Sequence, residues 1–293
     1  MPDRSFRADL ALVFVAFVWG STFVLVKEAL RDISTLLFLA LRFTLAGGVL
    51  AVGYRNRLSG VLDRHGASLQ GGMAAGACLF GGYVFQTFGL RLTTPSKSAF
   101  LTGMAIVLVP ALNAVIWRKR PQLAEAAGIG TATVGLALLT LEPGDWIVAL
   151  GDLLTLGGAV FFALHVIVLG VFAPKEGFER LSVFQIATAA ALALGTFWWV
   201  ETPQVEWSFT VAVALGVTGL LATAAAFTIQ AWAQQHTSPT RTALIFALEP
   251  VFAAATSFLA AGELLSRQQI AGAGLILAGI LLVELKPGLR SRR

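Results

Sequence analysis

The sequence predicts an all-α integral membrane protein with ten transmembrane helices, arranged as two inverted repeats of five helices. Hydrophobic residues make up 57% of the 293 residues and charged residues only 13%, whereas a soluble domain of this length carries roughly a quarter charged residues. The mean hydropathy is +0.79. The apolar residues form runs of the ~20 residues that a helix needs to cross a bilayer, without the ~10-residue alternating strands of a membrane β-barrel. The third observation is a repeated segment: TTPSKSA at 93–99 returns as TSPTRTA at 237–243.

Polar breaks divide the chain into ten apolar segments, and each is predicted to be a spanning helix. The first segment follows Arg4 and Arg7, as in a signal peptide, but no small-residue cleavage site comes after it, so we expect a retained span. The approximate bounds are 9–28, 34–53, 68–90, 96–117, 122–141, 151–172, 181–200, 208–233, 240–261 and 268–286.

Lysine and arginine residues predict the orientation, because they gather on the cytoplasmic side of membrane proteins. With the N-terminus in the cytoplasm, 15 of the 21 Lys and Arg residues fall at cytoplasmic ends of the spans and five at outer ends, while Arg42 lies inside a span. Both termini are therefore predicted to be cytoplasmic. The net charge of +5 then reflects orientation and does not indicate nucleic-acid binding.

The internal repeat extends well beyond its two opening segments. Residues 85–144 align without a gap with residues 229–288, and Gln86, Pro95 and Lys97 fall on Gln230, Pro239 and Arg241. We therefore expect a first repeat at 1–145 and a second at 146–293. Since five spans is an odd number, the second repeat is inverted in the membrane. Inverted repeats around a midplane site are typical of secondary transporters, and a duplicated scaffold without transport is the alternative.

The repeated segment is predicted to begin a helix at each face of the membrane. Its hydroxyl side chains can cap free backbone N–H groups, and its proline suits a first helical turn. The cation, Lys97 or Arg241, is unexpected there because it opposes the helix dipole. Two interpretations stay open: anchoring of a snorkelling side chain among lipid headgroups, or a basic residue at each mouth of a transport path that attracts carboxylates.

Two charged residues are predicted to lie deep in the membrane, where each marks a functional hypothesis. The depths of Arg42 and Glu249 differ by only ~4–5 Å in a ~30 Å core, so they could form a structural ion pair. Alternatively one of them contacts substrate or gates the path, and Glu249 could carry a coupling proton. Pro250 interrupts its helix and frees carbonyl groups, and the helices near Pro110 and Pro250 are expected to flex during gating.

Further polar and aromatic residues are candidates for a substrate cavity. Tyr83 and Gln86 lie three residues apart on one helix face, and Phe227 and Gln230 repeat this pair in the second half. Such a pair could stack an apolar side chain and hydrogen-bond an amino or carboxyl group, although helix packing explains it equally well. His165 and Trp19 are each either cavity-lining or packing residues.

Small residues predict close contact between helices. They comprise Gly72 and Gly76 in the third span and the stretch AGAGLILAG at 271–279 in the tenth. Packing within one chain is the first interpretation, and a dimer seam formed by the fifth and tenth spans is the alternative.

Several function classes lack their sequence signatures. There is no G-x-x-x-x-G-K-[ST] loop for ATP, no H-E-x-x-H and no G-x-S-x-G motif, so neither an ATP-driven pump nor an enzyme is expected. No metal-ligand spacing surrounds His165 or the single Cys78, and we expect no cofactor and no metal. The expected partners are a small-molecule substrate and membrane lipids, with no nucleic acid and no obligate protein partner.

Three segments resemble the EamA family of the drug/metabolite transporter superfamily: WGSTFVLVK at 19–27, RFTLAG at 42–47 and LEPVFAAATSFLAAGE at 248–263. The resemblance covers nearly the whole chain. Within the family the chain looks most similar to YddG-type amino-acid exporters of bacterial inner membranes. This implies export of amino acids, aromatic and other neutral ones among them, by alternating access through a central cavity. A related exporter of another metabolite or a drug, with or without proton coupling, is the alternative.

Overall fold

The computed structural model describes residues 4–58, 67–118, 122–141, 149–261 and 266–284. Most of these residues are helical, and the one β contact among them is an isolated antiparallel bridge between Ile33 and Val205. The predicted all-α class is confirmed. In chain order the elements are α1 (Arg4–Gly20), α2 (Phe23–Ala29), α3 (Thr35–Gly53), α4 (Arg55–Leu58), α5 (Ala67–Leu92), α6 (Pro95–Gly103), α7 (Ala105–Trp117), α8 (Leu123–Thr140), α9 (Leu150–Phe172), α10 (Phe178–Val200), α11 (Phe209–Gly216), the π-helix η1 (Val217–Ala225), α12 (Ala226–Ala233), α13 (Pro239–Phe246), α14 (Glu249–Ala261) and α15 (Arg267–Glu284).

Eight of the predicted spans coincide with helices that are long and apolar enough to cross a membrane, beginning with Arg4–Ala29 and ending with Phe209–Ala233. The predicted span 268–286 coincides with a shorter apolar helix, Arg267–Val283. The predicted span 240–261 is divided between α13 and α14. The protein is thus a multi-pass membrane protein, while the count of ten spans stays a prediction.

Three of the predicted spans are interrupted, and a fourth contains the π-helix. At each interruption a backbone N–H bonds to the carbonyl three residues earlier: Thr22 to Trp19 (3.0 Å), Met104 to Leu101 (3.2 Å) and Leu248 to Ile245 (3.0 Å). These tight turns place helix ends inside the bundle. Irregular backbone at membrane depth is tolerated where it is buried in protein or lines a cavity.

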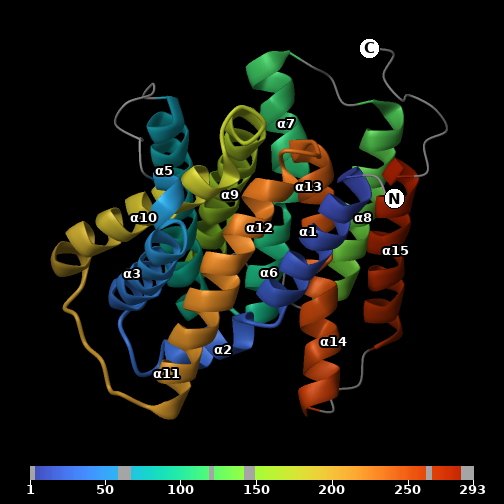
Figure 1. Cartoon of the computed structure of the whole chain (residues 1–293). Helices are drawn as coiled ribbons and strands as arrows, with labels where there is room; N and C mark the ends of the chain where they lie inside the picture. The colour runs from blue at the N-terminus through green and yellow to red at the C-terminus, as the bar shows by residue number, and fades with distance from the viewer. Residues whose placement is uncertain (1–3, 59–66, 119–121, 142–148, 262–265, 285–293) are drawn as a thin grey trace.

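Helices that correspond in the predicted repeats run in opposite directions (Figure 1). In this view the chain rises through α6 and α7 but descends through α13 and α14, and α8 and α15 are likewise antiparallel. The start of α1 and the end of α15 lie toward the same end of the bundle. This arrangement supports the predicted inversion and agrees with both termini on one side.

Glycines let helices from the two halves approach closely. α5 packs along α9, and α8 packs along α15. A Cβ atom on Gly135 would lie 2.6 Å from the carbonyl oxygen of Gly272, and one on Gly279 would lie 2.6 Å from that of Gly128. The small residues of α8 and α15 therefore pack against each other within one chain, which was the first interpretation of this pattern.

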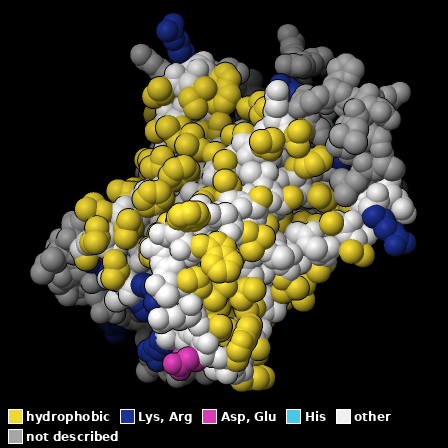
Figure 2. Space-filling view, turned by 90° about the vertical axis from the view of Figure 1, so that its left-hand side faces the viewer, with side chains coloured by type: hydrophobic (Ala, Val, Ile, Leu, Met, Phe, Trp, Pro, Cys, Tyr) yellow, Lys and Arg dark blue, Asp and Glu magenta, His cyan; other side chains and the backbone are white. Residues whose placement is uncertain are grey.

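The outer surface is apolar along the bundle. Figure 2 shows hydrophobic side chains over much of the height of one face, with the acidic side chains in view at its lower end. Large hydrophobic side chains point outward, for example Leu123 (88% exposed) and Trp199 (86% exposed). Trp198, Trp199, Trp207 and Phe209 are all exposed around the loop between α10 and α11, as in the aromatic belt of a membrane–water interface.

Candidate central cavity

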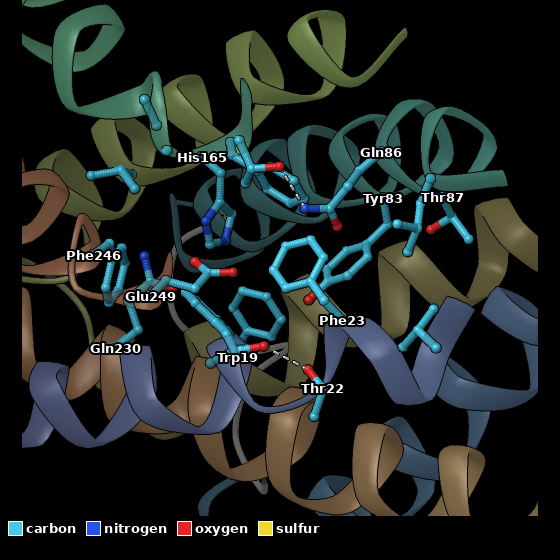
Figure 3. A pocket seen from close by; sticks show the side chains of 18 of the residues that line it. Trp19, Thr22, Phe23, Tyr83, Gln86, Thr87, His165, Gln230, Phe246 and Glu249 are labelled. Atoms are coloured by element: carbon cyan, nitrogen blue, oxygen red, sulfur yellow. Dashed lines mark hydrogen bonds between the residues drawn. The ribbon is translucent and has the colours of Figure 1, made fainter. Parts of the chain in front are cut away.

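A cavity of about 90 Å³ lies between helices of the two halves (Figure 3). At roughly 10–15 Å³ per water molecule, it has room for several waters or one small molecule. All eight predicted substrate-binding residues line it, together with further aromatic residues that were not predicted from the sequence. The lining residues include Trp19, Phe23, Arg42, Tyr83, Gln86, Thr102, Phe162, His165, Phe227, Gln230, Phe246 and Glu249.

Trp19 is positioned by the interruption between α1 and α2. Its indole Nε1 donates to the carbonyl oxygen of Ala222 in η1 (2.9 Å), and its ring lies 5.1 Å from that of Phe227 and 4.9 Å from that of Phe246. Thr22 Oγ1 donates to the Trp19 carbonyl oxygen (2.8 Å), so this carbonyl has a side-chain partner at the tight turn. Trp19 both packs between helices and forms part of the cavity wall.

Arg42 is buried (4% exposed) and is held by neutral groups from other helices. Its Nε donates to Thr223 Oγ1 (2.7 Å), and its Nη2 donates to Tyr83 Oη (2.9 Å) and more weakly to the Ala222 carbonyl oxygen (3.4 Å). Its guanidinium carbon also lies 4.3 Å from the centre of the Tyr83 ring. Two of its acceptors, Ala222 and Thr223, belong to the π-helix, a rare element that is frequent at functional sites.

Glu249 begins α14 immediately after the interruption at Ala247 and Leu248. Figure 3 shows its carboxylate reaching into the cavity, near His165, Trp19 and Phe246. Glu249 forms no ion pair with Arg42 in the described part of the chain, although both residues line the cavity. The possible structural pair between the two is therefore not formed, because Arg42 is held by Tyr83 and η1 instead.

The two aromatic–amide pairs come together at the cavity, but their amides are held differently. Gln86 Nε2 donates to Thr102 Oγ1 in α6 (2.9 Å). Gln230 Nε2 donates to Gln234 Oε1 (2.9 Å), and Gln234 in turn donates to the Val166 carbonyl oxygen (2.8 Å). The Oε1 atom of Gln230 is buried without a hydrogen-bond partner among the described residues.

His165 is buried on α9 and contacts α10 and α12. Its Nε2 lies 2.8 Å from Gln185 Oε1, and its ring packs edge-on against Phe227 with centroids 5.4 Å apart. Both open interpretations therefore apply, since the residue packs between helices and also lines the cavity. Gln185, which orients the ring, was not singled out from the sequence. No group of three metal-ligating side chains occurs in the described ranges.

The repeated cations lie at the starts of α6 and α13, and each pairs with an aspartate of the other half. Lys97 Nζ lies 2.9 Å from Asp152 Oδ2 on α9, and the same carboxylate accepts from Thr93 Oγ1 (2.6 Å). Arg241 Nη2 lies 2.5 Å from Asp9 Oδ2 on α1. The two interpretations from the sequence were anchoring among lipid headgroups and a basic residue at each mouth of the path. Neither of them included these ion pairs between the repeats. We call them the α6 pair (Lys97–Asp152) and the α13 pair (Arg241–Asp9).

The two prolines sit differently relative to the interruptions. Pro250 is the second residue of α14 and directly follows the interruption at 247–248. Pro110 lies inside α7, six residues after the interruption at Met104. A gating role for the helix segments around these prolines stays a prediction.

A multi-pass bundle with oppositely directed repeats around a polar-lined cavity has the architecture of many secondary transporters. The chain belongs to the EamA-like transporter family, whose model matches residues 6–141 and again residues 149–285. The resemblance to this family and its two-repeat architecture are thereby confirmed, and the chain is a membrane transporter.

Relatives with matching sequences are transporters and not enzymes. An uncharacterized transporter of Archaeoglobus fulgidus is 32% identical over 95% of this chain and 86% of the relative. A probable amino-acid metabolite efflux pump of Salmonella typhimurium is 26% identical over 93% of each chain. A crystal structure with 23% identity superposes with a TM-score of 0.77 over 95% of this chain and 96% of the other, which shows the same fold. The narrower likeness to YddG-type exporters stays a prediction.

Proposed function

We propose that this transporter exports neutral amino acids, aromatic ones among them, from the cytoplasm through the central cavity. The observation that carries the proposal is that Arg42 and Glu249 line one aromatic-walled cavity without pairing with each other. An α-amino acid supplies the complementary charges, an ammonium group for Glu249 and a carboxylate for Arg42. Its apolar side chain fits the walls formed by Trp19 and the phenylalanines.

The similarity to the probable amino-acid metabolite efflux pump of Salmonella typhimurium supports this substrate class and direction. Gln86 and Gln230 add amide groups that can hydrogen-bond a substrate near the two charges. The alternative, another small metabolite or a drug in a proton-coupled exchange, shares the cavity but does not require both charges to contact the substrate.

We further propose that the path works by alternating access. The α6 pair and the α13 pair lie at the starts of the two corresponding broken helices, which begin at opposite ends of the bundle (Figure 1). Each pair joins a helix of one repeat to a helix of the other. Opening one mouth separates these helices and breaks its pair, while the other pair keeps the opposite mouth closed.

The proposed location is a bacterial inner membrane with both termini in the cytoplasm. The 15-to-5 distribution of basic residues supports this orientation. In this orientation the α13 pair closes the cytoplasmic mouth, and the α6 pair closes the outer mouth.

The test is uptake of radiolabelled phenylalanine, methionine and threonine into proteoliposomes of the purified protein, with no imposed ion gradient. Saturable uptake that unlabelled amino acids inhibit is expected, and protein-free liposomes give the background. Uptake at background for all three amino acids, with or without an imposed proton gradient, would exclude the amino-acid proposal. Uptake only with the proton gradient would replace facilitated export by proton-coupled export.

A further inference from the structure

The two charges in the cavity are held in different ways. Glu249 is the one acidic side chain among the described residues that line the cavity. No described residue donates a hydrogen bond to its carboxylate or forms an ion pair with it. Glu249 is the first residue of α14, so its carboxyl group lies at the positive end of that helix dipole. The carboxylate is therefore an acceptor that the protein leaves available to a ligand.

Arg42 presents the opposite case. Three hydrogen bonds to neutral acceptors and the stacking on Tyr83 hold its guanidinium in place. Much of its donor capacity is thus used by the protein itself, and 4% of the residue is exposed. A ligand carboxylate would gain a favourable charge at Arg42 but would compete with bonds that already exist.

The surroundings of Glu249 suit an organic cation. Phe246 is the last residue of α13, three residues before Glu249, and its ring centroid lies 4.9 Å from that of Trp19. Indole and phenyl faces attract ammonium groups within about 6 Å. A carboxylate and aromatic faces at one site are the groups that recognise a protonated amine.

We infer that recognition depends on the ammonium group, so that the substrate class is primary amines with an aromatic or apolar body, with or without an α-carboxylate. This inference rests on the proposed function only in placing the substrate in this cavity. The amine donates to the Glu249 carboxylate, and the apolar body packs against Trp19 and Phe246. The carboxylate of an amino acid then contributes less to affinity than its amine.

The experiment compares three compounds that share a phenyl ring: L-phenylalanine, 2-phenylethylamine without the carboxylate, and 3-phenylpropionate without the amine. Binding to the purified full-length protein in lipid nanodiscs is measured by calorimetry at pH 7. We expect 2-phenylethylamine to bind within about threefold of L-phenylalanine and 3-phenylpropionate to bind about 10- to 100-fold more weakly, as for loss of a hydrogen bond to a charged group. Equal binding of the amine and the acid would overturn the inference.

Substitutions test whether the Glu249 carboxylate is the group that binds the amine. Glu249→Gln keeps the shape of the side chain and is expected to weaken 2-phenylethylamine binding by about 10- to 100-fold. Glu28→Gln is the matched control, because Glu28 is half-exposed and pairs with Arg31 outside the cavity. Unchanged amine affinity in folded Glu249→Gln would contradict the inference. If that variant does not fold, the three-compound comparison on the unmodified protein decides alone.

The outcomes separate this inference from the proposed function. Saturable phenylalanine uptake without binding of 2-phenylethylamine would leave amino-acid export standing and reject amine recognition. Binding of the amine without amino-acid uptake would do the opposite.

Discussion

The two repeats share the ion pairs at the starts of their broken helices and differ in the residues of the central cavity. The family matches begin at residues 6 and 149 and end at 141 and 285, so corresponding residues are 143 apart early in the repeats and 144 apart late. On this basis Asp9 corresponds to Asp152 and Lys97 to Arg241. The α6 and α13 pairs are therefore the same contact made twice, once between each broken helix and the first helix of the other repeat.

Two of the three interruptions correspond, although the prolines do not, and the interruption at Thr22 has no counterpart because the matching segment lies within the continuous helix α9. Met104 corresponds to Leu248, and each lies in a tight turn between two helices. Pro110 falls on Ala254, and Pro250 falls on Ile106. Since the interruption recurs while each proline occurs once, the proline positions are not what the two interruptions have in common.

The cavity residues have diverged. Arg42 corresponds to Gln185, and Glu249 corresponds to Ala105, so each charge occurs once. The segment that corresponds to η1 lies within α5, which is a continuous α-helix. Elements that both conformations of an alternating-access transporter need are expected to be symmetric. Groups that bind one asymmetric substrate need not be symmetric. The ion pairs occur in both repeats, whereas Arg42 and Glu249 each occur in one.

The largest expected effect concerns the glycine contacts between α8 and α15. Gly135→Ala and its counterpart Gly279→Ala each place a Cβ atom 2.6 Å from a backbone carbonyl oxygen of the facing helix. Such overpacking costs about 1–3 kcal/mol, and we expect the two variants to lower the Tm of the purified protein to a similar extent. The measurement is thermal unfolding in detergent followed by size-exclusion chromatography.

The control for this prediction lies on the same two helices. A Cβ atom on Gly130 or its counterpart Gly274 meets no atom within 4 Å. Gly130→Ala and Gly274→Ala increase helix propensity as much as Gly135→Ala and Gly279→Ala do, but without a close contact. They should leave the Tm unchanged or raise it. A difference in sign between Gly135→Ala and Gly279→Ala would show that the seam is not symmetric.

The next effect tests the α6 and α13 pairs as opposing gates. An ion pair of about 1 kcal/mol changes a two-state equilibrium by about fivefold. Arg241→Ala should favour opening at its own mouth, and Lys97→Ala should favour opening at the other. The reporters are the corresponding substitutions Ala99→Cys and Ala243→Cys, with the native Cys78 replaced by Ser, labelled by a membrane-impermeant thiol reagent.

Each charge substitution should raise labelling at the near cysteine and lower it at the far one. The charge-exchanged double variant Lys97→Asp with Asp152→Lys should restore the balance in part. If either substitution raises labelling at both cysteines equally, the pairs stabilise the fold without acting as opposing gates.

A smaller effect is expected where the cavity is asymmetric. Tyr83→Phe converts the first aromatic–amide pair into a copy of the second, which already has Phe227. The change removes the hydroxyl that accepts from Arg42 at 2.9 Å but leaves the stacked ring. We expect a loss of about 1 kcal/mol in stability, measured as a lower Tm.

Composition, helix periodicity and the internal repeat predict most of the fold, because a bilayer requires long apolar helices. The interruption at Leu248 agrees with the helix break predicted at Pro250, whereas the one at Met104 has no proline next to it and could not be predicted. The same limit explains the missed π-helix, whose sequence of small and β-branched residues resembles any membrane helix. For the cavity, the charges of Arg42 and Glu249 and their depth in the membrane predicted that both residues are functional candidates. Their separation depends on Tyr83 and Thr223, which approach Arg42 only through tertiary packing.

The smallest effect concerns two acidic residues in the connecting loops of the two repeats. Asp32, between α2 and α3, accepts a hydrogen bond from Ser208 Oγ (2.6 Å). Glu176, between α9 and α10, has both carboxylate oxygens buried without a hydrogen-bond partner among the described residues. Burial raises the pKa of Glu176 from its ordinary 4.5 to about 7, and the neighbouring Lys175 offsets only part of this. One loop thus satisfies its acidic group, and the other does not.

The raised pKa makes stability depend on pH with a definite sign. The folded state keeps the Glu176 proton at pH values where the unfolded chain has lost it, so the contribution is complete below about pH 4.5 and is lost as the pH rises to about 7. Glu176→Gln should therefore leave the Tm unchanged at pH 5 and raise it slightly at pH 8, by less than about 1 kcal/mol for this partly exposed group. Asp32→Ala should lower the Tm at pH 8, because it removes a bonded carboxylate. A Glu176→Gln variant whose Tm difference from the parent protein is the same at pH 5 and pH 8 would show that Glu176 is ionised in the folded state at both.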